Sequence, residues 1–210
     1  MEWGVLWKYS DHLLAGLKLT LWLSCASIVG ATIVGILVGS LSTSTNFFIQ
    51  KLTRLYTEVL RNIPAVVKLF MLYFVVGLDA ISASIGALVL HQSAYIADVT
   101  AAGLRSVPHG QLEAARSCGH SNTQVFRYVL LPQAMRIVIP PLTTQYIEIV
   151  KNSAIVSMIA VEDLTFQTQM IEIESFRGFE ATTAVTVAYL VIALLIAFAM
   201  SRLQRAMTRP

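Results

Sequence analysis

Four polar residues follow one another closely in an apolar stretch of this 210-residue chain. Glu148 and Lys151 are three positions apart, so a helix would place the carboxylate and the ammonium on one face. Asn152 and Ser153 follow directly in the sequence. Charged groups in apolar surroundings are costly unless they pair with each other or line a polar cavity. We therefore predict that these four residues line a polar path; an internal salt bridge that holds a broken helix is the alternative.

A second group of polar residues interrupts an earlier apolar stretch. Pro64 predicts a kink or a break in the helix that contains it. Arg61 and Asn62 precede this proline, and Arg61 is three positions from Glu58. These two charges could pair on one helical face or extend separately to a water interface. Lys68 lies deeper, which favours a protein-facing or water-facing position. We assign Arg61, Asn62, Pro64 and Lys68 to the same predicted path.

The sequence has no arrangement typical of catalysis or metal binding. The two cysteines, Cys25 and Cys118, give neither a disulfide framework nor the spacing of metal ligands. There is no G-x-S-x-G motif, and His91 has no obvious partner for nucleophilic chemistry. There is also no G-x-x-x-x-G-K-S/T phosphate-binding loop, so the chain is not expected to bind ATP itself. We predict no catalytic residue, no metal site and no bound cofactor, and an intramembrane enzyme is a remote alternative.

Composition places the chain in a membrane. Hydrophobic residues make up 56% of it and charged residues 13%, with a mean hydropathy of +0.68. Soluble domains average about 25% charged residues, so a soluble chain this apolar would have too little polar surface. The net charge of +3 is modest and the basic residues are dispersed, which argues against a nucleic-acid partner.

The apolar runs predict an all-α polytopic membrane protein with five transmembrane helices in a single domain, residues 1–210. A membrane-spanning helix needs about 20 apolar residues, and Pro140 and Pro141 should bend the fourth span. An acidic link is expected from Glu162 to Glu180. The predicted spans cover approximately residues 19–41, 56–77, 81–104, 129–161 and 181–201.

Basic residues are unevenly distributed between the two sides that these spans define. Eight lysines and arginines fall on one side and three on the other. The richer side is expected to be cytoplasmic, which places the N-terminus outside and the C-terminus in the cytoplasm. The eight are Lys51, Arg54, Arg105, Arg116, Arg127, Arg202, Arg205 and Arg209, and the three are Lys8, Lys18 and Arg177.

The longest polar interval, from about residue 105 to 128, lies on the predicted cytoplasmic side. Pro108 suits the first turn of a helix, and residues 111–118 are mostly good helix formers. Gly119 then stands where a helix favours a left-handed residue after its last turn. The interval therefore predicts a short water-facing helix, a glycine stop and a second helix; an ordinary interfacial amphipathic helix is the alternative.

This interval resembles the EAA loop of bacterial ABC importer permeases. The pattern is E-A-A, three residues, glycine, nine residues and V-x-L-P, with Val129 where the family usually has isoleucine. The resemblance implies that the loop forms a coupling helix that docks into a separate ATPase subunit, with Glu113 holding the shape of the loop. The residues assigned to coupling are Pro108, Gly110, Glu113, Ala114, Ala115 and Gly119.

Other segments resemble the polar amino-acid branch of this family. These are Y-T-E-V-L-R-N-I-P, L-P-Q-A, I-P-P-L and K-N-S-A-I-V-S-M-I-A-V-E-D-L. The segment A-Y-I-A-D departs from the family pattern, because Asp98 replaces a glutamate and Ala101 stands where an arginine is common. The K-N-S-A form resembles the glutamate/aspartate branch, which implies import of glutamate or aspartate; glutamine or basic amino acids are the alternative.

The resemblance also implies the rest of the assembly. An importer of this kind has two permease subunits, identical or related, two ATPase subunits that bind ATP and Mg²⁺, and a periplasmic or extracellular solute-binding protein. It works by alternating access in a bacterial inner (cytoplasmic) membrane, surrounded by lipid. The chain would therefore be a permease and not an enzyme, and a passive channel is the other remote alternative.

Overall fold

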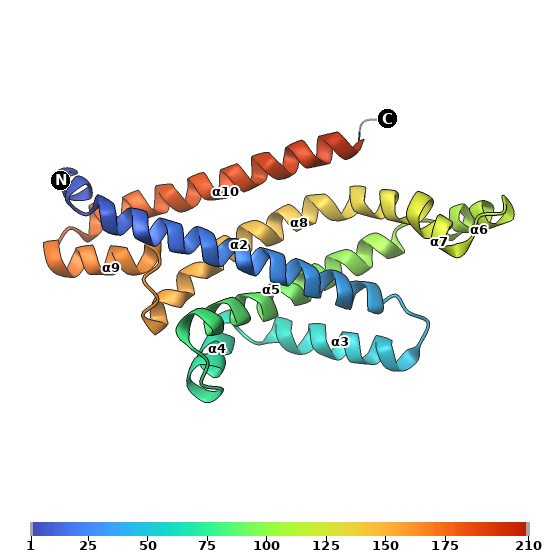
Figure 1. Cartoon of the computed structure of the whole chain (residues 1–210), viewed down its shortest axis with the longest axis horizontal. Helices are drawn as coiled ribbons and strands as arrows, with labels where there is room; N and C mark the ends of the chain where they lie inside the picture. Colours follow the sequence, from blue (N-terminus) through green and yellow to red (C-terminus); the bar gives the residue numbers. More distant parts are fainter. Residues whose placement is uncertain (1, 209–210) are drawn as a thin grey trace.

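The computed structural model describes residues 2–208, and within them the chain is helical without strands, which confirms the predicted all-α class (Figure 1). The α-helices are α1 Gly4–Lys8, α2 Ser10–Leu41, α3 Phe47–Asn62, α4 Ala65–Phe70, α5 Ala80–Arg105, α6 His109–Ser117, α7 Asn122–Val125, α8 Leu131–Ser153, α9 Leu164–Ser175 and α10 Gly178–Thr208. Two π-helical segments, η1 Met71–Val75 and η2 Phe126–Leu130, and one 3₁₀ segment, η3 Ala154–Ile159, connect them.

Within residues 2–208, three helices are long and apolar enough to cross a membrane, namely α2, α5 and α10. The helix α5 matches its predicted span to within one residue, whereas α2 begins at Ser10 and not near residue 19. Asp79 caps α5 by accepting backbone hydrogen bonds from Ile81 and Ser82. Hydrogen bonding from Ser82 lowers the pKa of the Asp79 carboxyl.

The second predicted span, residues 56–77, is divided into two helices at Pro64. The helix α3 begins at Phe47 and ends at Asn62, and α4 starts only after an extended pair, Ile63 and Pro64. A proline disfavours helical geometry in the residue before it, because its ring collides with that residue's backbone. The break at Pro64 is therefore confirmed, and η1 extends α4 toward the next loop.

The fourth span is also composite. The segment η2 leads into α8, which has Pro132 in its first turn and runs through Pro140 and Pro141 without interruption. After Ser153 the chain tightens into η3, which ends at a left-handed residue, Ala160, with φ 59°. The α-helix thus ends two residues after Lys151, which agrees with the broken helix of the alternative interpretation.

The acidic link from 162 to 180 contains a helix that the sequence interpretation missed. The Asp163 side chain caps α9 by accepting from the Phe166 backbone N–H at 2.8 Å. Leu164 and Ile171 are buried, and the Leu164 backbone N–H donates to Thr20 of α2 at 3.0 Å. The helix α9 therefore packs against α2 as part of the bundle.

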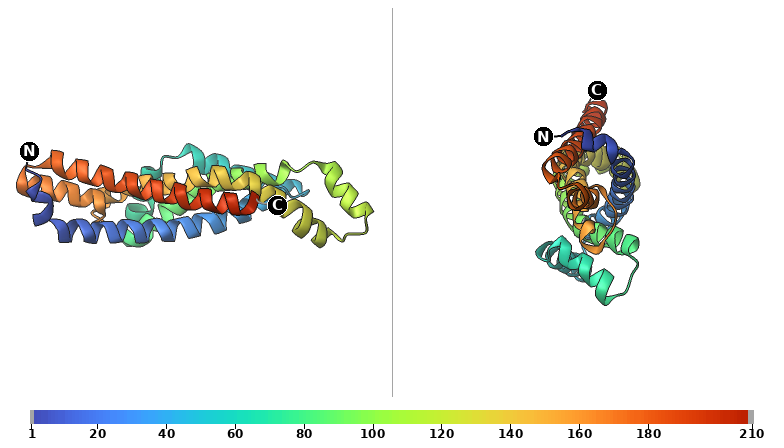
Figure 2. Two further views of the ribbon diagram at one scale, coloured as in Figure 1. Left: turned by 90° about the horizontal axis from the view of Figure 1, so that it is seen from above. Right: turned by 90° about the vertical axis from the view of Figure 1, so that its left-hand side faces the viewer.

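The core lies where α2 crosses α5. The small residues at positions 27, 31, 35 and 39 of α2 are all buried. An added Cβ at Gly35 would lie 2.5 Å from Ile96, and one at Gly39 would lie 2.5 Å from the Ala97 carbonyl. Small residues allow such close approach of helices. The bundle is elongated, with α6 and α7 at one end and the N-terminus and α9 at the other (Figure 2).

Candidate functional site

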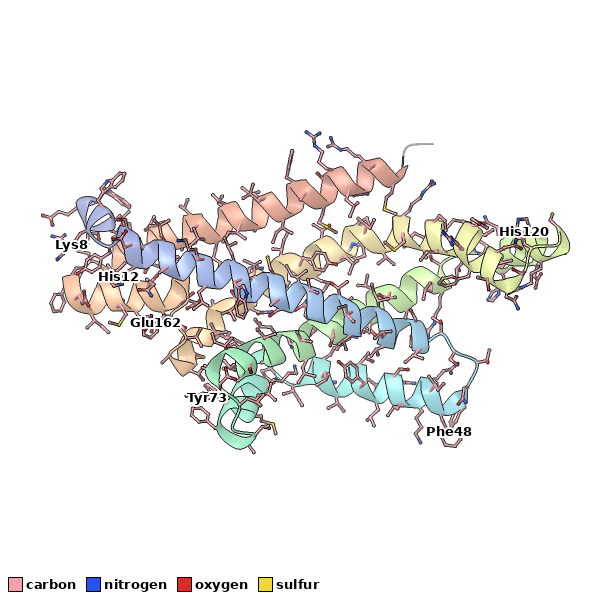
Figure 3. The ribbon with its side chains drawn as sticks, in the orientation of Figure 1. Lys8, His12, Phe48, Tyr73, His120 and Glu162 are labelled. Atoms are coloured by element: carbon pink, nitrogen blue, oxygen red, sulfur yellow. The ribbon has the colours of Figure 1, made fainter. Side chains whose placement is uncertain are left out.

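The first candidate region is the projecting pair α6 and α7, residues 109–125, which we call the coupling hairpin. No residue of α6 is buried, and α7 buries only Val125. Figure 3 places His120 at this end of the molecule, far from Lys8 and Glu162 at the other end. The coupling hairpin therefore presents an open surface.

Local hydrogen bonds determine the shape of this hairpin. Gly119 has φ +86°, as the glycine stop predicted, and its N–H donates to the Arg116 carbonyl at 2.9 Å. The His120 N–H donates to the Ala115 carbonyl at 3.2 Å, which completes the left-handed helix ending. A Cβ at Gly119 would meet nothing within 4 Å, so the backbone conformation, and not space, requires glycine.

The second helix of the hairpin begins with a capping box. The Ser121 hydroxyl accepts from the Gln124 N–H, and the Gln124 side chain accepts from the Ser121 N–H at 2.8 Å.

Glu113 was expected to hold the shape of the loop, but its side chain makes no such contact within residues 2–208. Among the described residues, its exposed carboxylate has no hydrogen bond or ion pair, and only its carbonyl accepts from Ser117. Pro108, Gly110 and Ala114 are also exposed.

The second candidate region is the charged end of α8. The Lys151 ammonium donates to the Glu148 carboxylate at 2.7 Å, with side chains 59% and 39% exposed. The predicted pair is therefore confirmed on a face that this chain leaves open. Asn152 is half-buried beside it. Ser153 is fully buried, and its hydroxyl donates to the Val150 carbonyl at 2.7 Å, so it presents no surface to a path here.

The charges of α3 pair differently from the expectation. Glu58 pairs with Arg54, one turn earlier, at 2.7 Å. Arg61 instead pairs with Asp98 of α5 and lies over the Tyr95 ring at 5.1 Å from its centroid. The proposed Glu58–Arg61 pair is wrong, because Arg61 lies on the flank of α3 that faces α5.

Lys68 lies at the break between α3 and α4. It is buried, which is the protein-facing one of the two predicted positions, and its ammonium donates to the Ile63 carbonyl at 2.7 Å. The same nitrogen lies 2.9 Å from Nδ1 of His91. A helix end leaves backbone carbonyls without hydrogen-bond donors. Lys68 of α4 supplies such a donor to the Ile63 carbonyl on the other side of the break. His91 is thus a partnered residue of the bundle.

The structure brings part of the predicted path together along α5. His91 and Tyr95 stack edge to face at 5.4 Å and connect Lys68 with Arg61. Exposed Asn62 and Pro64 lie between them in the sequence. Within residues 2–208, no hydrogen bond or ion pair joins the side chains of this group to those of Glu148 or Lys151. A polar link between α5 and α8 is the amide pair of buried Gln92 and half-buried Gln145, at 2.5 Å; no sequence motif gave a signal for it.

Comparison with known proteins decides the family. Residues 31–209 match the binding-protein-dependent transport system inner membrane components. The chain belongs to this family. Membership makes it an inner membrane component of a transport system. It confirms the resemblance to ABC importer permeases that the E-A-A loop indicated. A permease of this kind is a transporter subunit and not an enzyme.

Relatives in the family match almost end to end. The glutamine transport system permease protein GlnP of Escherichia coli (strain K12) is 33% identical, over 98% of this chain and 97% of that protein. The probable glutamine ABC transporter permease protein GlnM of Bacillus subtilis (strain 168) is 32% identical, over 98% and 97%. The Escherichia coli (strain K12) glutamate/aspartate import permease protein GltJ is 32% identical, over 96% and 89%.

Solved structures confirm the type I importer permease fold. A crystal structure of an amino acid ABC transporter with histidines superposes with a TM-score of 0.88 at 31% identity, over 98% of this chain and 99% of that chain. An inward-facing form of the MetNI methionine ABC transporter gives a TM-score of 0.81 at 25% identity, over 96% and 99%.

Proposed function

We propose that this chain is the membrane permease of an ATP-driven importer of polar amino acids. The observation that carries the proposal is the coupling hairpin, an exposed helix fixed by Gly119 at one end of an apolar bundle. Its place in the family and relatives named for glutamine and glutamate/aspartate support an amino-acid substrate.

The Glu148–Lys151 pair favours glutamine over an acidic substrate. A lone ammonium in a poorly hydrated path would attract a second carboxylate by Coulomb attraction. At 2.7 Å, the Glu148 carboxylate offsets that charge, so the local field is close to neutral and suits a zwitterion without net charge. Glutamate and aspartate, which the K-N-S-A segment predicts, are the alternative.

The proposed mechanism is alternating access. ATP binds between two ATPase subunits, and each coupling hairpin moves with its ATPase as a rigid body. Its capping box and glycine stop allow it to transmit force without unfolding. A transported ligand shifts the equilibrium only by its different affinity for the two states. The breaks after Asn62 and Ser153 are the points where neighbouring segments can change direction.

The assembly needs partners on both sides of the membrane. We propose a second permease, identical or related, to close the path that one five-helix chain leaves open. A solute-binding protein delivers the amino acid at the end that carries α9. The N-terminus lies outside and the C-terminus in the cytoplasm. Labels at Ser121 and Ser175 test this orientation: Ser121 should react only from the cytoplasm and Ser175 only from outside.

Reconstituted uptake tests the function. Proteoliposomes that contain the importer, with ATP inside and the cognate binding protein outside, are offered labelled glutamine, glutamate, aspartate and arginine. Glutamine uptake that requires ATP supports the proposal. Flux that does not depend on ATP would support a passive channel. Preferential uptake of glutamate or aspartate would support the substrate that the K-N-S-A segment predicts.

A further inference from the structure

A second polar site lies between α3 and α5, away from the charged end of α8. It is a cavity of about 280 Å³. Arg54 and Thr57 of α3 line it, as do Asp98 and Arg105 of α5. Neither Glu148 nor Lys151 is part of its wall. Its lining residues on α5 belong to the last turns of that helix, which runs toward the coupling hairpin in Figure 1.

Two arginines from different helices, Arg54 of α3 and Arg105 of α5, line this cavity. Arg105 donates to the Ser42 carbonyl at 2.8 Å, and Arg54 donates through Nε to Glu58 at 2.7 Å. A guanidinium has five N–H donors, so each has further donors for an anion. Arginine binds a carboxylate in a planar, bidentate way. This wall is therefore suited to a carboxylate.

The same cavity carries a negative charge on another wall. Asp98 lines it and is bound by Arg61 on one oxygen. An ionised carboxylate has about four acceptor sites, which leaves positions for an ammonium. The lining thus offers acceptors as well as guanidinium donors, which suits both charges of a zwitterion, whereas a lipid phosphate would use only the arginines. The exposed apolar residues of α3, such as Leu52 and Leu55, are absent from the lining.

A small side chain keeps this space open. Ala101 is 7% exposed and lines the cavity, at the position where an arginine is common in the A-Y-x-A-E pattern. A long side chain there would extend into the cavity and add a third positive charge. The departure from the family pattern thus coincides with the cavity.

We propose that this cavity binds the zwitterionic backbone of the transported amino acid from the cytoplasmic side. Arg54 and Arg105 bind the carboxylate, Asp98 accepts from the ammonium, and Thr57 and Gln50 border the side chain. The proposal rests on the amino-acid import proposed above. It makes the cavity an exit-side site, and a high internal concentration of amino acid would occupy it and slow import.

Binding to the complete importer without its solute-binding protein tests the site. Permease and ATPase are purified together in nanodiscs, and labelled L-glutamine is measured by equilibrium dialysis. Arg105→Gln should weaken this binding about tenfold or more, because a charge-assisted contact is lost. Ala101→Arg should abolish it by filling the space. Arg202→Gln on α10, a basic residue predicted for the same side, is the matched control and should bind as wild type. Co-purification with the ATPase verifies that each variant is assembled.

A transport measurement separates this site from the path at α8. Proteoliposomes are preloaded with unlabelled glutamine, and initial uptake of labelled glutamine is followed. Internal glutamine should slow the wild type and leave the rate of Ala101→Arg unchanged. The proposal is overturned if Arg105→Gln and Ala101→Arg bind glutamine like wild type, or if only Lys151→Gln reduces binding. It also falls if wild type imports glutamine normally but binds none without the solute-binding protein. If wild type imports no amino acid at all, the proposed function fails first.

Discussion

The coupling hairpin and the break between α3 and α4 both redirect a helix, but they are stabilised in opposite ways. In the hairpin, Gly119 ends α6 in a left-handed conformation and every bond that fixes the turn comes from nearby residues. At the break, Pro64 ends α3, and a buried lysine then reaches back to the Ile63 carbonyl while contacting a histidine of α5. The hairpin depends on bonds between neighbouring residues, whereas the break, at exposed Asn62 and Pro64, depends on the buried Lys68 side chain and on tertiary packing.

This difference fits the proposed roles. A docking element must keep its shape while its surface is free, so short-range bonds suit it. A hinge inside the membrane has no water to satisfy its backbone groups, so side chains from elsewhere must supply partners. We therefore expect the largest effect from a substitution that changes the backbone of the hairpin, and smaller effects from substitutions that change single side-chain contacts.

Gly119→Val is expected to have the largest effect, the loss of transport. A β-branched residue in a left-handed conformation costs on the order of 1–2 kcal/mol or more, which should distort the docking surface. The protein should still insert, because Gly119 lies outside the bundle. Uptake in proteoliposomes and co-purification of the ATPase should fall together. Gly4→Val, at an open position in α1, is the control, and full transport by Gly119→Val would contradict the assigned role.

Lys68→Met should lower the stability of the bundle without touching the hairpin. It leaves the carbonyl of half-buried Ile63 without its lysine donor, at a cost of roughly 1–3 kcal/mol. The midpoint of thermal unfolding in detergent should fall. Lys51→Met, on the exposed part of α3, is the control. An unchanged midpoint would mean that Pro64 alone determines the break.

Lys151→Gln tests whether the charge pair at the end of α8 is structural, like the Lys68 contact at the break. If Lys151 mainly offsets Glu148, the single change leaves an unpaired carboxylate in the membrane, and the protein level should fall. Adding Glu148→Gln should restore both level and uptake. Uptake that collapses at a normal protein level would show instead that Lys151 meets the substrate.

Glu113→Gln should have the smallest effect on the fold. Its carboxylate has no partner among the described residues, so the unfolding midpoint should stay at the wild-type value. Loss of the charge should weaken only ATPase co-purification, if this exposed face docks as proposed. A lower midpoint would show that Glu113 holds the hairpin together after all.

Local chemistry explains what the sequence alone predicted correctly. The glycine stop at Gly119 and the break at Pro64 follow from backbone sterics, which do not depend on distant contacts. The long apolar runs of α5 and α10 predicted spans because length and hydropathy are properties of the segment itself. The loop motif indicated the family because its glycine and its spaced pattern lie within one short interval.

The tertiary structure decided which groups pair. Glu58 offered Arg61 a partner three residues away, yet Arg61 pairs with Asp98, 37 positions along the chain. The acidic link folded into α9 because Thr20 and the buried face of α2 lie beside it. Charges and backbone donors choose partners by distance in space, and a linear pattern does not contain that distance. The cavity at Ala101 arises in the same way, because it exists only where α3 and α5 meet.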